Sequence, residues 1–241
     1  MTQFSDDLYL GAACTNVTAG NNGGFGVGPM GRTYTYDIVP AALSATNLAA
    51  SQSGTASTAL TLTAGAGVTT SVDAVGRTVY SPDVPRNVRI TSAGNDSAAT
   101  FLVSGIDAYG QPMTERITGA NAGVAQGAKA FAGIYSITPS ANTAAAVTVG
   151  TGDKFGLPFR LYDANHVIGV KWASALAQDA GTIVAGDSTD PATATTGDVR
   201  GTYLPSSASN GSRRLTLTMF LGGIASGPTG TRAGALGVTQ A

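Results

Sequence analysis

Few residues in this sequence can do acid–base or nucleophilic chemistry. The only histidine, His166, could act with a serine and an aspartate in a hydrolytic triad. However, the sequence lacks the Gly-x-Ser-x-Gly turn that presents the serine in one large class of hydrolases. The only cysteine, Cys14, has no cation or histidine near it in the sequence that would activate its thiol. We therefore interpret His166 as a turn residue beside a strand and Cys14 as an inert thiol.

Residues for metal binding or sugar cleavage are equally sparse. One histidine and one cysteine cannot build a structural zinc site. Asp187, Asp190 and Asp198 are close in sequence, but the regular acidic loop of a calcium site is absent, so we interpret them as turn-capping residues. A glycosidase needs two carboxylates, and Glu115 is the only glutamate. We predict no catalytic, metal-binding or cofactor-binding residues.

Two glycine-rich segments match phosphate-binding loops only formally. Gly26–Gly31 has the spacing Gly-x-Gly-x-x-Gly, but a Gly/Asn coil precedes it and a strand-like run follows it. A dinucleotide site needs a strand before this motif and a helix after it. Gly150–Lys154 lacks the Ser or Thr that follows the lysine of a P-loop. Neither segment predicts nucleotide binding.

The remaining candidates are contact residues rather than catalytic ones. Four arginines lie on predicted strands, where a charge either protects a strand edge or pairs across an interface: Arg86, Arg89, Arg213 and Arg214. The excess of ten arginines over three lysines favours interfaces, because arginine pairs bidentately with carboxylates. Near the start of the chain, isolated apolar residues are candidate anchors on a partner: Phe4, Leu8, Tyr9 and Phe25.

The composition predicts an all-β fold. Only 11% of the 241 residues are charged, and the glutamate and lysine that helices favour are nearly absent. Threonine, valine and glycine replace them, which favours strands and turns and excludes a helical bundle. The net charge of −1 supplies no field for nucleic acid. No apolar stretch is long enough to span a membrane, and the start of the chain lacks the features of a signal peptide, so we expect a protein made in the host cytoplasm without export.

Short apolar–polar alternations with turn signals between them predict ten to twelve strands, which is typical of a β-sandwich or barrel. The turn at Asp107–Pro112 predicts a hairpin. The segment Ala41–Ala50 is either a loop or a short helix. The predicted strands are residues 34–39, 59–63, 68–80, 86–90, 99–104, 113–118, 131–138, 145–149, 155–162, 167–172, 198–204 and 213–220. We therefore predict an N-terminal extended arm over 1–33, a β-sandwich domain over 34–220 and a C-terminal arm over 221–241.

Several segments of the sequence resemble those of a known protein family. They are Pro82–Ile90, Gly105–Glu115, Val149–Pro158, Gly197–Tyr203 and Arg214–Leu217. Over Pro82–Phe220 the chain resembles the capsid cement, or decoration, proteins of short-tailed (podovirus-like) bacteriophages. The resemblance implies a β-sandwich, often jelly-roll-like, that forms a homodimer or homotrimer. It also implies a place on the outer surface of the phage head, where the protein binds the major capsid protein and bridges capsomers. It implies no catalytic residues.

Three other functions stay open at this point. A receptor- or glycan-binding protein of a head or tail fibre would carry exposed aromatic residues at loop tips, and the candidates are Tyr109, Tyr135 and Tyr162. A tail-tube subunit would polymerise into rings. A polysaccharide hydrolase would work with pairs of aspartates.

Overall fold

The computed structural model describes residues 32–221, which form fourteen strands and no α-helix. The all-β prediction is confirmed. The one helical turn described is a 3₁₀ turn, η2 (Ala164–His166). Within the described range there is no helix long and apolar enough to cross a membrane. The strands are β1 (Arg32–Ile38), β2 (Ala49–Gln52), β3 (Val68–Val72), β4 (Thr78–Pro82), β5 (Arg86–Ser92), β6 (Thr100–Ile106), β7 (Pro112–Thr118), β8 (Val124–Gln126), β9 (Gly133–Pro139), β10 (Val147–Gly156), β11 (Val167–Trp172), β12 (Thr182–Ala185), β13 (Gly201–Leu204) and β14 (Leu215–Leu221).

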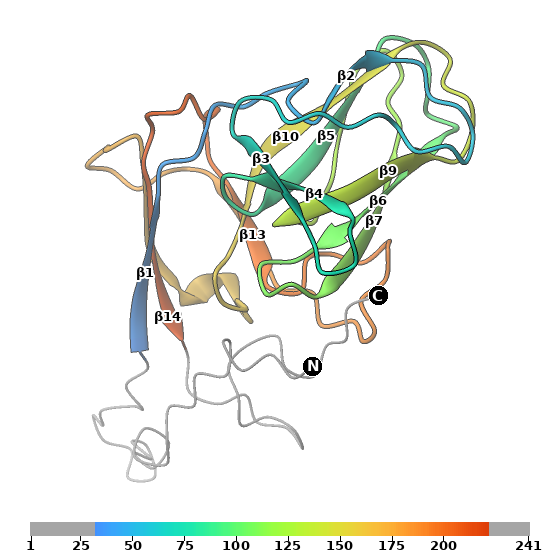
Figure 1. Ribbon diagram of the computed structural model, residues 1–241. Coiled ribbons are helices and arrows are strands. Elements are labelled where there is room, and N and C mark those ends of the chain that lie inside the picture. Colours follow the sequence, from blue (N-terminus) through green and yellow to red (C-terminus); the bar gives the residue numbers. More distant parts are fainter. Residues whose placement is uncertain (1–31, 222–241) are drawn as a thin grey trace, which may run out of the picture.

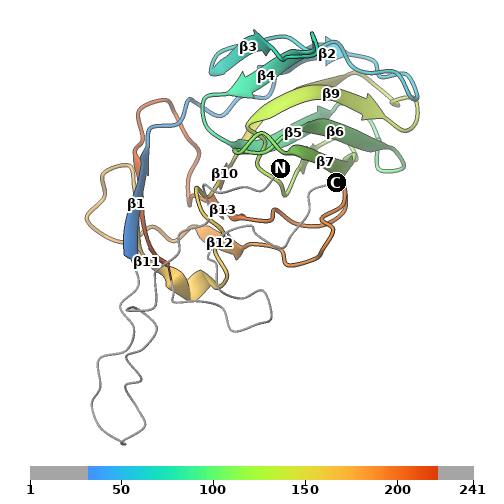
Figure 2. The same ribbon diagram turned by 60° about the horizontal axis from the view of Figure 1, so that its bottom comes forward.

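Two antiparallel sheets enclose the larger hydrophobic core. One has the strand order β3-β4-β9-β6-β7, and the other has the order β12-β13-β10-β5-β8, with β2 also pairing with β10. Alternate residues of β6 and β7 point inward, so that Phe101, Val103 and Ile117 meet Val88 and Ile90 of β5 in the core. Buried and more exposed residues alternate along β6 and β7 because successive side chains of a strand point to opposite faces of the sheet. This part of the molecule is sandwich-like (Figure 2).

A third, three-stranded sheet closes a second core. Its order is β1-β14-β11, and it stands to one side of the other two sheets (Figure 1). Leu215 and Leu217 of β14 and Trp172 of β11 pack there against Phe155 of β10 and Tyr203 of β13. Strand β10 therefore contributes to both cores, with Val147 and Val149 in the first and Phe155 in the second.

The predicted hairpin at Asp107–Pro112 is present and joins β6 to β7. The Asp107 Oδ1 atom accepts hydrogen bonds from the backbone N–H groups of Tyr109 and Gln111. Gly110 takes a positive φ of 78°, a conformation that glycine adopts without steric cost. The turn residues thus have the local roles that the sequence indicates.

Some predicted elements are wrong. Residues 59–63 form no strand. They form an irregular segment, which we call the strap, that is held to its neighbours by backbone hydrogen bonds: the Leu60 N–H donates to Ile137 O and the Thr63 N–H donates to Leu48 O. The alternation of leucine and threonine was misleading, because this segment buries the Leu60 side chain without forming the regular backbone hydrogen bonds of a β-strand. Residues 68–80 form two strands, and 155–162 is strand only to Gly156. Of the two alternatives for Ala41–Ala50, the structure has the loop as far as Leu48, after which β2 begins. The short strands β2, β8 and β12 were not predicted.

Candidate functional site

The junction of the two cores holds a buried arginine. Arg86, at the start of β5, is 1% exposed, and all five of its N–H donors are used. Two of the bonds are ion pairs, at 3.1 Å to Asp83 and 2.7 Å to Asp153. The five acceptors belong to four separate segments of the chain: Ala41 O, Asp83 Oδ1, Gly152 O, Asp153 Oδ1 and Ser209 Oγ. Arg86 therefore ties these segments together at the point where β10 leaves one core and enters the other.

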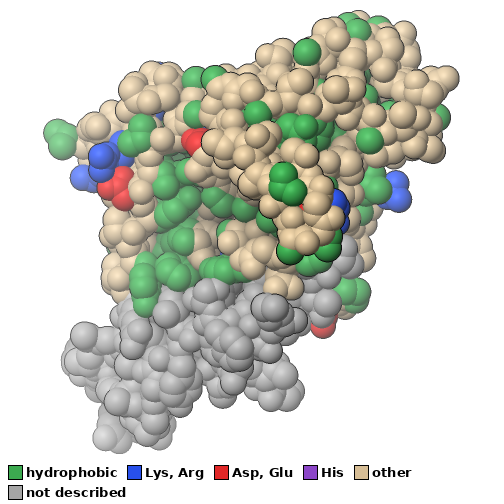
Figure 3. Space-filling model, in the orientation of Figure 1, with side chains coloured by type: hydrophobic (Ala, Val, Ile, Leu, Met, Phe, Trp, Pro, Cys, Tyr) green, Lys and Arg blue, Asp and Glu red, His purple; other side chains and the backbone are tan. Residues whose placement is uncertain are grey.

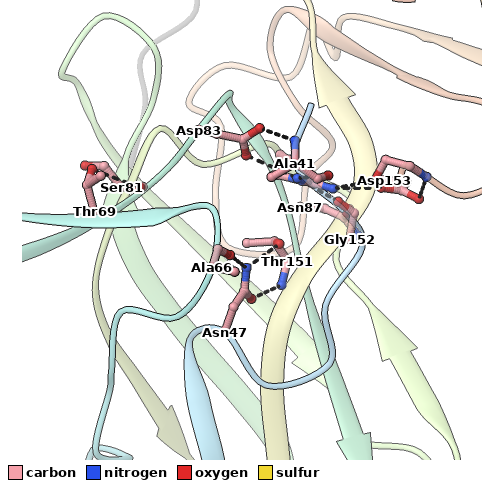
Figure 4. Close-up of polar contacts among 12 residues, drawn as sticks. Ala41, Asn47, Ala66, Thr69, Ser81, Asp83, Asn87, Thr151, Gly152 and Asp153 are labelled. Atoms are coloured by element: carbon pink, nitrogen blue, oxygen red, sulfur yellow. Dashed lines mark hydrogen bonds and ion pairs between the residues drawn. The ribbon is translucent and has the colours of Figure 1, made fainter. Parts of the chain in front are cut away.

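Two buried asparagines extend this polar junction. The Asn87 Oδ1 atom accepts the backbone N–H of Lys154 at 3.0 Å. The Asn47 side chain exchanges two hydrogen bonds with Thr151, through the Thr151 N–H and Oγ1, each at 2.9 Å (Figure 4). Buried amides that are satisfied in this way hold their neighbours in one arrangement. The central segment of β10 is consequently bonded through side chains as well as through its ladder.

A second buried ion pair lies below the β6–β7 hairpin. Arg200 Nη1 donates to Asp107 Oδ2 at 2.9 Å, and neither side chain is exposed. The Arg200 guanidinium lies 4.9 Å from the centroid of the Tyr109 ring, whose hydroxyl donates to Pro158 O. Tyr109 is thus packed into the fold, which argues against its prediction as an exposed loop-tip contact.

The four arginines predicted as contact residues differ in how exposed they are. Arg86 is wrong as an intermolecular contact, because its guanidinium is buried and fully bonded within the chain. Arg89 is partly buried, and its Nε has no partner among the described residues. Arg214 is exposed and pairs with Asp37 of β1 at 2.7 Å, while Arg213 donates to Ser207 Oγ at 3.0 Å. The anchors Phe4, Leu8, Tyr9 and Phe25 lie outside the described residues.

His166 and Asp187, which we interpreted from the sequence as structural residues, both take part in hydrogen bonds of local turns. His166 ends the 3₁₀ turn η2, where its backbone N–H donates to Asp163 O. Asp187 caps a turn by accepting the N–H groups of Thr189 and Gly197. Within residues 32–221, no group of three or more His, Cys, Asp or Glu side chains is arranged to hold a metal ion.

Glu115 lies beneath a surface depression of about 370 Å³. Its Oε1 atom accepts the N–H groups of Ala128 and Lys129, whereas its buried Oε2 has no hydrogen-bond partner in the described part of the chain. Burial raises the pKa of the Glu115 carboxyl and lowers the pKa of the Lys129 ammonium, which donates to Thr193 O at 2.7 Å. An ideal Cβ on Gly127 would lie 2.5 Å from Oε2, so the chain covers this oxygen. Glu115 therefore lines the depression and, through Oε1, holds the backbone at Ala128 and Lys129.

A second depression, of about 440 Å³, lies on the outer face of the five-stranded sheet. We call it the tyrosine groove. Its lining combines two tyrosines, three hydroxyl side chains, two leucines and one arginine: Leu60, Leu62, Arg77, Thr78, Tyr80, Ser104, Tyr135 and Ser136. It has no lining carboxylate, and this mixture of rings and hydroxyls makes it the candidate binding site.

A β-bulge places Tyr135 in the tyrosine groove. Across β6 and β9, Ser104 pairs with Ser136 but Gly105 pairs with Ile134, so Tyr135 is the extra residue. Sequence alternation could not reveal this bulge, because it depends on a close approach between two strands. The nearest sequence signal is Gly105, where an ideal Cβ would lie 2.1 Å from Gly133 O.

Comparison with protein-family models, curated proteins and solved structures finds no match to this chain. Its function therefore has to be argued from the chain's own residues and geometry.

Proposed function

We propose that the chain is a structural virion protein, a capsid cement or decoration protein that binds the outside of a phage major capsid shell and bridges capsomers. It acts as a homodimer or homotrimer. The proposal joins the resemblance over Pro82–Phe220 to the geometry of the described residues.

The pairing of β1 with β14 is the observation that carries the proposal. The two strands are antiparallel, with Arg32 opposite Leu221. The two ends of the described range, Arg32 and Leu221, therefore lie side by side (Figure 1). Two attachment segments that start from one point reach neighbouring subunits of a shell at little cost in sequence length, and their affinities combine.

An apolar hollow next to β1 and β14 supports the same function. Hydrophobic side chains gather there between the three-stranded sheet and the rest of the molecule (Figure 3). Tyr36, Ile38, Val84 and Phe159 pack against the second core but are only partly buried. A partly covered apolar surface is typical of a site that another protein completes.

The segments that carry the resemblance also hold six of the nine buried charged residues in the described part of the chain. Arg86, Asp107, Asp153 and Arg200 all lie within them and make ion pairs inside the fold. A rigid body suits a cement protein, because such a protein stabilises a shell by binding the assembled form and not the free subunit. Tightly bonded junctions keep the attachment surfaces in one arrangement.

The test is cosedimentation of the full chain with shells assembled from the major capsid protein of the same phage. Unassembled capsid protein is the matched control. We expect the chain to sediment with shells, to saturate at a fixed ratio to the capsid protein, and to leave free subunits unbound. Failure to bind shells, or equal binding to free subunits, would contradict the proposal. Localisation of the chain to the tail in purified virions would instead favour the tail-tube alternative.

A further inference from the structure

The tyrosine groove has its chemical groups held in place. Arg77 lies over the ring of Tyr135, with its guanidinium carbon 4.1 Å from the ring centroid. Its Nε donates to Asp73 Oδ2 at 2.8 Å. Tyr80, on the neighbouring strand β4, donates its hydroxyl hydrogen to Leu62 O of the strap at 3.1 Å. Both tyrosine rings are therefore positioned before any ligand arrives, which lowers the entropic cost of binding.

The groove is close to neutral in charge. Hydrogen bonds from the Arg77 backbone N–H, and further bonds from its side chain and from the Val75 N–H, lower the pKa of Asp73 below its ordinary value. The carboxylate therefore stays ionised beside the arginine and balances its charge. Within residues 32–221, Nη1 and Nη2 of Arg77 donate to no protein acceptor. These nitrogens provide hydrogen-bond donors without a large net positive field.

The floor of the groove offers hydroxyls rather than backbone groups. Thr78, Ser104 and Ser136 come from β4, β6 and β9, all of which are interior strands of the five-stranded sheet (Figure 1). β6 pairs with both β7 and β9, whereas β4 and β9 pair only at Tyr80 and Ile134, and beyond that point the Leu60 N–H donates to Ile137 O of β9. These partners leave little free strand edge for an extended peptide to pair with. Hydroxyl groups, which both donate and accept, are the polar groups that a ligand would meet.

We propose that the tyrosine groove binds a neutral saccharide. The apolar C–H groups of a sugar ring pack against the tyrosine and leucine side chains that line the groove, where Arg77 covers one face of the Tyr135 ring. The sugar hydroxyls exchange hydrogen bonds with the serine, threonine and arginine side chains. The volume of about 440 Å³ is within the range of small-ligand sites. The groove lies on a different sheet from β1 and β14, so this binding goes beyond shell attachment and is independent of it.

The test is a titration of the isotope-labelled full chain, followed by backbone amide NMR signals. The probes are neutral oligosaccharides of glucose, galactose, mannose and N-acetylglucosamine, with sialyllactose as the charged counterpart of lactose. We expect at least one neutral probe to bind with a Kd on the order of 1 mM. We expect the shifted signals to come from residues 77–81, 104 and 135–136. Lactose should bind at least as tightly as sialyllactose.

Two variants separate recognition from folding. Tyr135→Leu should weaken binding of the responding sugar about fivefold to tenfold, because it removes both the aromatic ring and the surface on which Arg77 is stacked. Tyr162→Leu is the matched control, since Tyr162 is also stacked with an arginine, Arg160 at 4.9 Å, but lies outside the groove. Tyr162→Leu should bind like the natural chain. If Tyr135→Leu does not fold, Ser136→Ala tests the same groove with a smaller change.

Three results would overturn the proposal. One is that no neutral probe shifts the groove signals at about 20 mM, which is well above the expected Kd. Another is that the shifts map outside the groove or that Tyr162→Leu weakens binding as much as Tyr135→Leu. The third is clearly tighter binding of sialyllactose than of lactose, which would make the ligand an acidic saccharide. None of these results bears on cosedimentation with shells, so the two proposals fail separately.

Discussion

Arg86 shows how a chain with few charges uses them. Nine charged side chains of the described residues are buried, and Arg86 satisfies all five of its donors within the fold. Replacing one member of a buried ion pair lowers the free energy of unfolding far more than breaking an exposed pair, because the remaining buried charge is left without a counter-charge. The arginine that the sequence suggests for an interface therefore acts as an internal clamp.

Arg86→Lys should lower the free energy of unfolding by about 3–5 kcal/mol. Lysine keeps the charge but cannot reach both Asp83 and Asp153 while also bonding to Gly152 O. Urea unfolding, followed by tryptophan fluorescence of Trp172, measures the change.

The matched control is Arg214→Lys, which alters an exposed pair with Asp37. We expect a change of about 0–1 kcal/mol for this variant. Equal effects of the two substitutions would contradict the role of Arg86 as a clamp.

The bulge between β6 and β9 decides what the outer face of the five-stranded sheet presents. Regular pairing would place Tyr135 and Ser136 on opposite faces, whereas the extra residue turns both away from the core. The bulge requires the backbone of Gly105 to lie against Gly133 O. Gly105 thus permits the close approach of β6 and β9 at the register shift that places Tyr135 in the tyrosine groove.

Gly105→Ala should be strongly destabilising, because its Cβ would lie 2.1 Å from Gly133 O and 2.9 Å from the Phe131 ring. We expect a loss of about 2 kcal/mol or more, and a fall in the thermal midpoint of about 5 °C or more. Thermal unfolding measured by circular dichroism tests this.

Gly123→Ala provides the control, since an added Cβ there meets its nearest atom at 3.6 Å. Its thermal midpoint should stay close to that of the natural chain. A similar fall for both variants would mean that the Gly105 contact is not the cause.

The molecule as a whole places both described ends at one side. Strand β1 pairs with β14 along seven residues, so the first and last described segments are neighbours although they are far apart in the sequence. The apolar hollow lies next to them (Figure 3). Attachment and the tyrosine groove therefore involve different sheets of one body.

Removal of residues 1–28 takes away Phe4, Leu8, Tyr9 and Phe25 but leaves every described strand intact. We expect the truncated chain to keep its circular dichroism spectrum and to lose much of its affinity for shells. Cosedimentation of the truncated and full chains at several concentrations measures the difference. Full occupancy of shells by the truncated chain would count against a role for these residues in attachment.

Local signals in the sequence predicted local features well. The Asp107–Pro112 hairpin, the alternation of β6 and β7 and the absence of α-helices from the described residues all follow from turn chemistry, alternation and composition. These features depend on residues within a few positions of each other, which is why they could be predicted. The strap over 59–63 was mistaken for a strand because alternation reports which side chains are buried and not which backbone groups pair.

The contacts between distant segments could not be predicted from local patterns. Arg86 meets Asp153 and Ser209, which follow it by 67 and 123 residues, and Tyr135 meets Arg77 across the face of the sheet. Composition and alternation therefore settled the all-β class. The packing of the strands settled which arginine is buried, where the tyrosine groove forms and that β1 lies beside β14, because each of these requires segments far apart in the chain to meet in space.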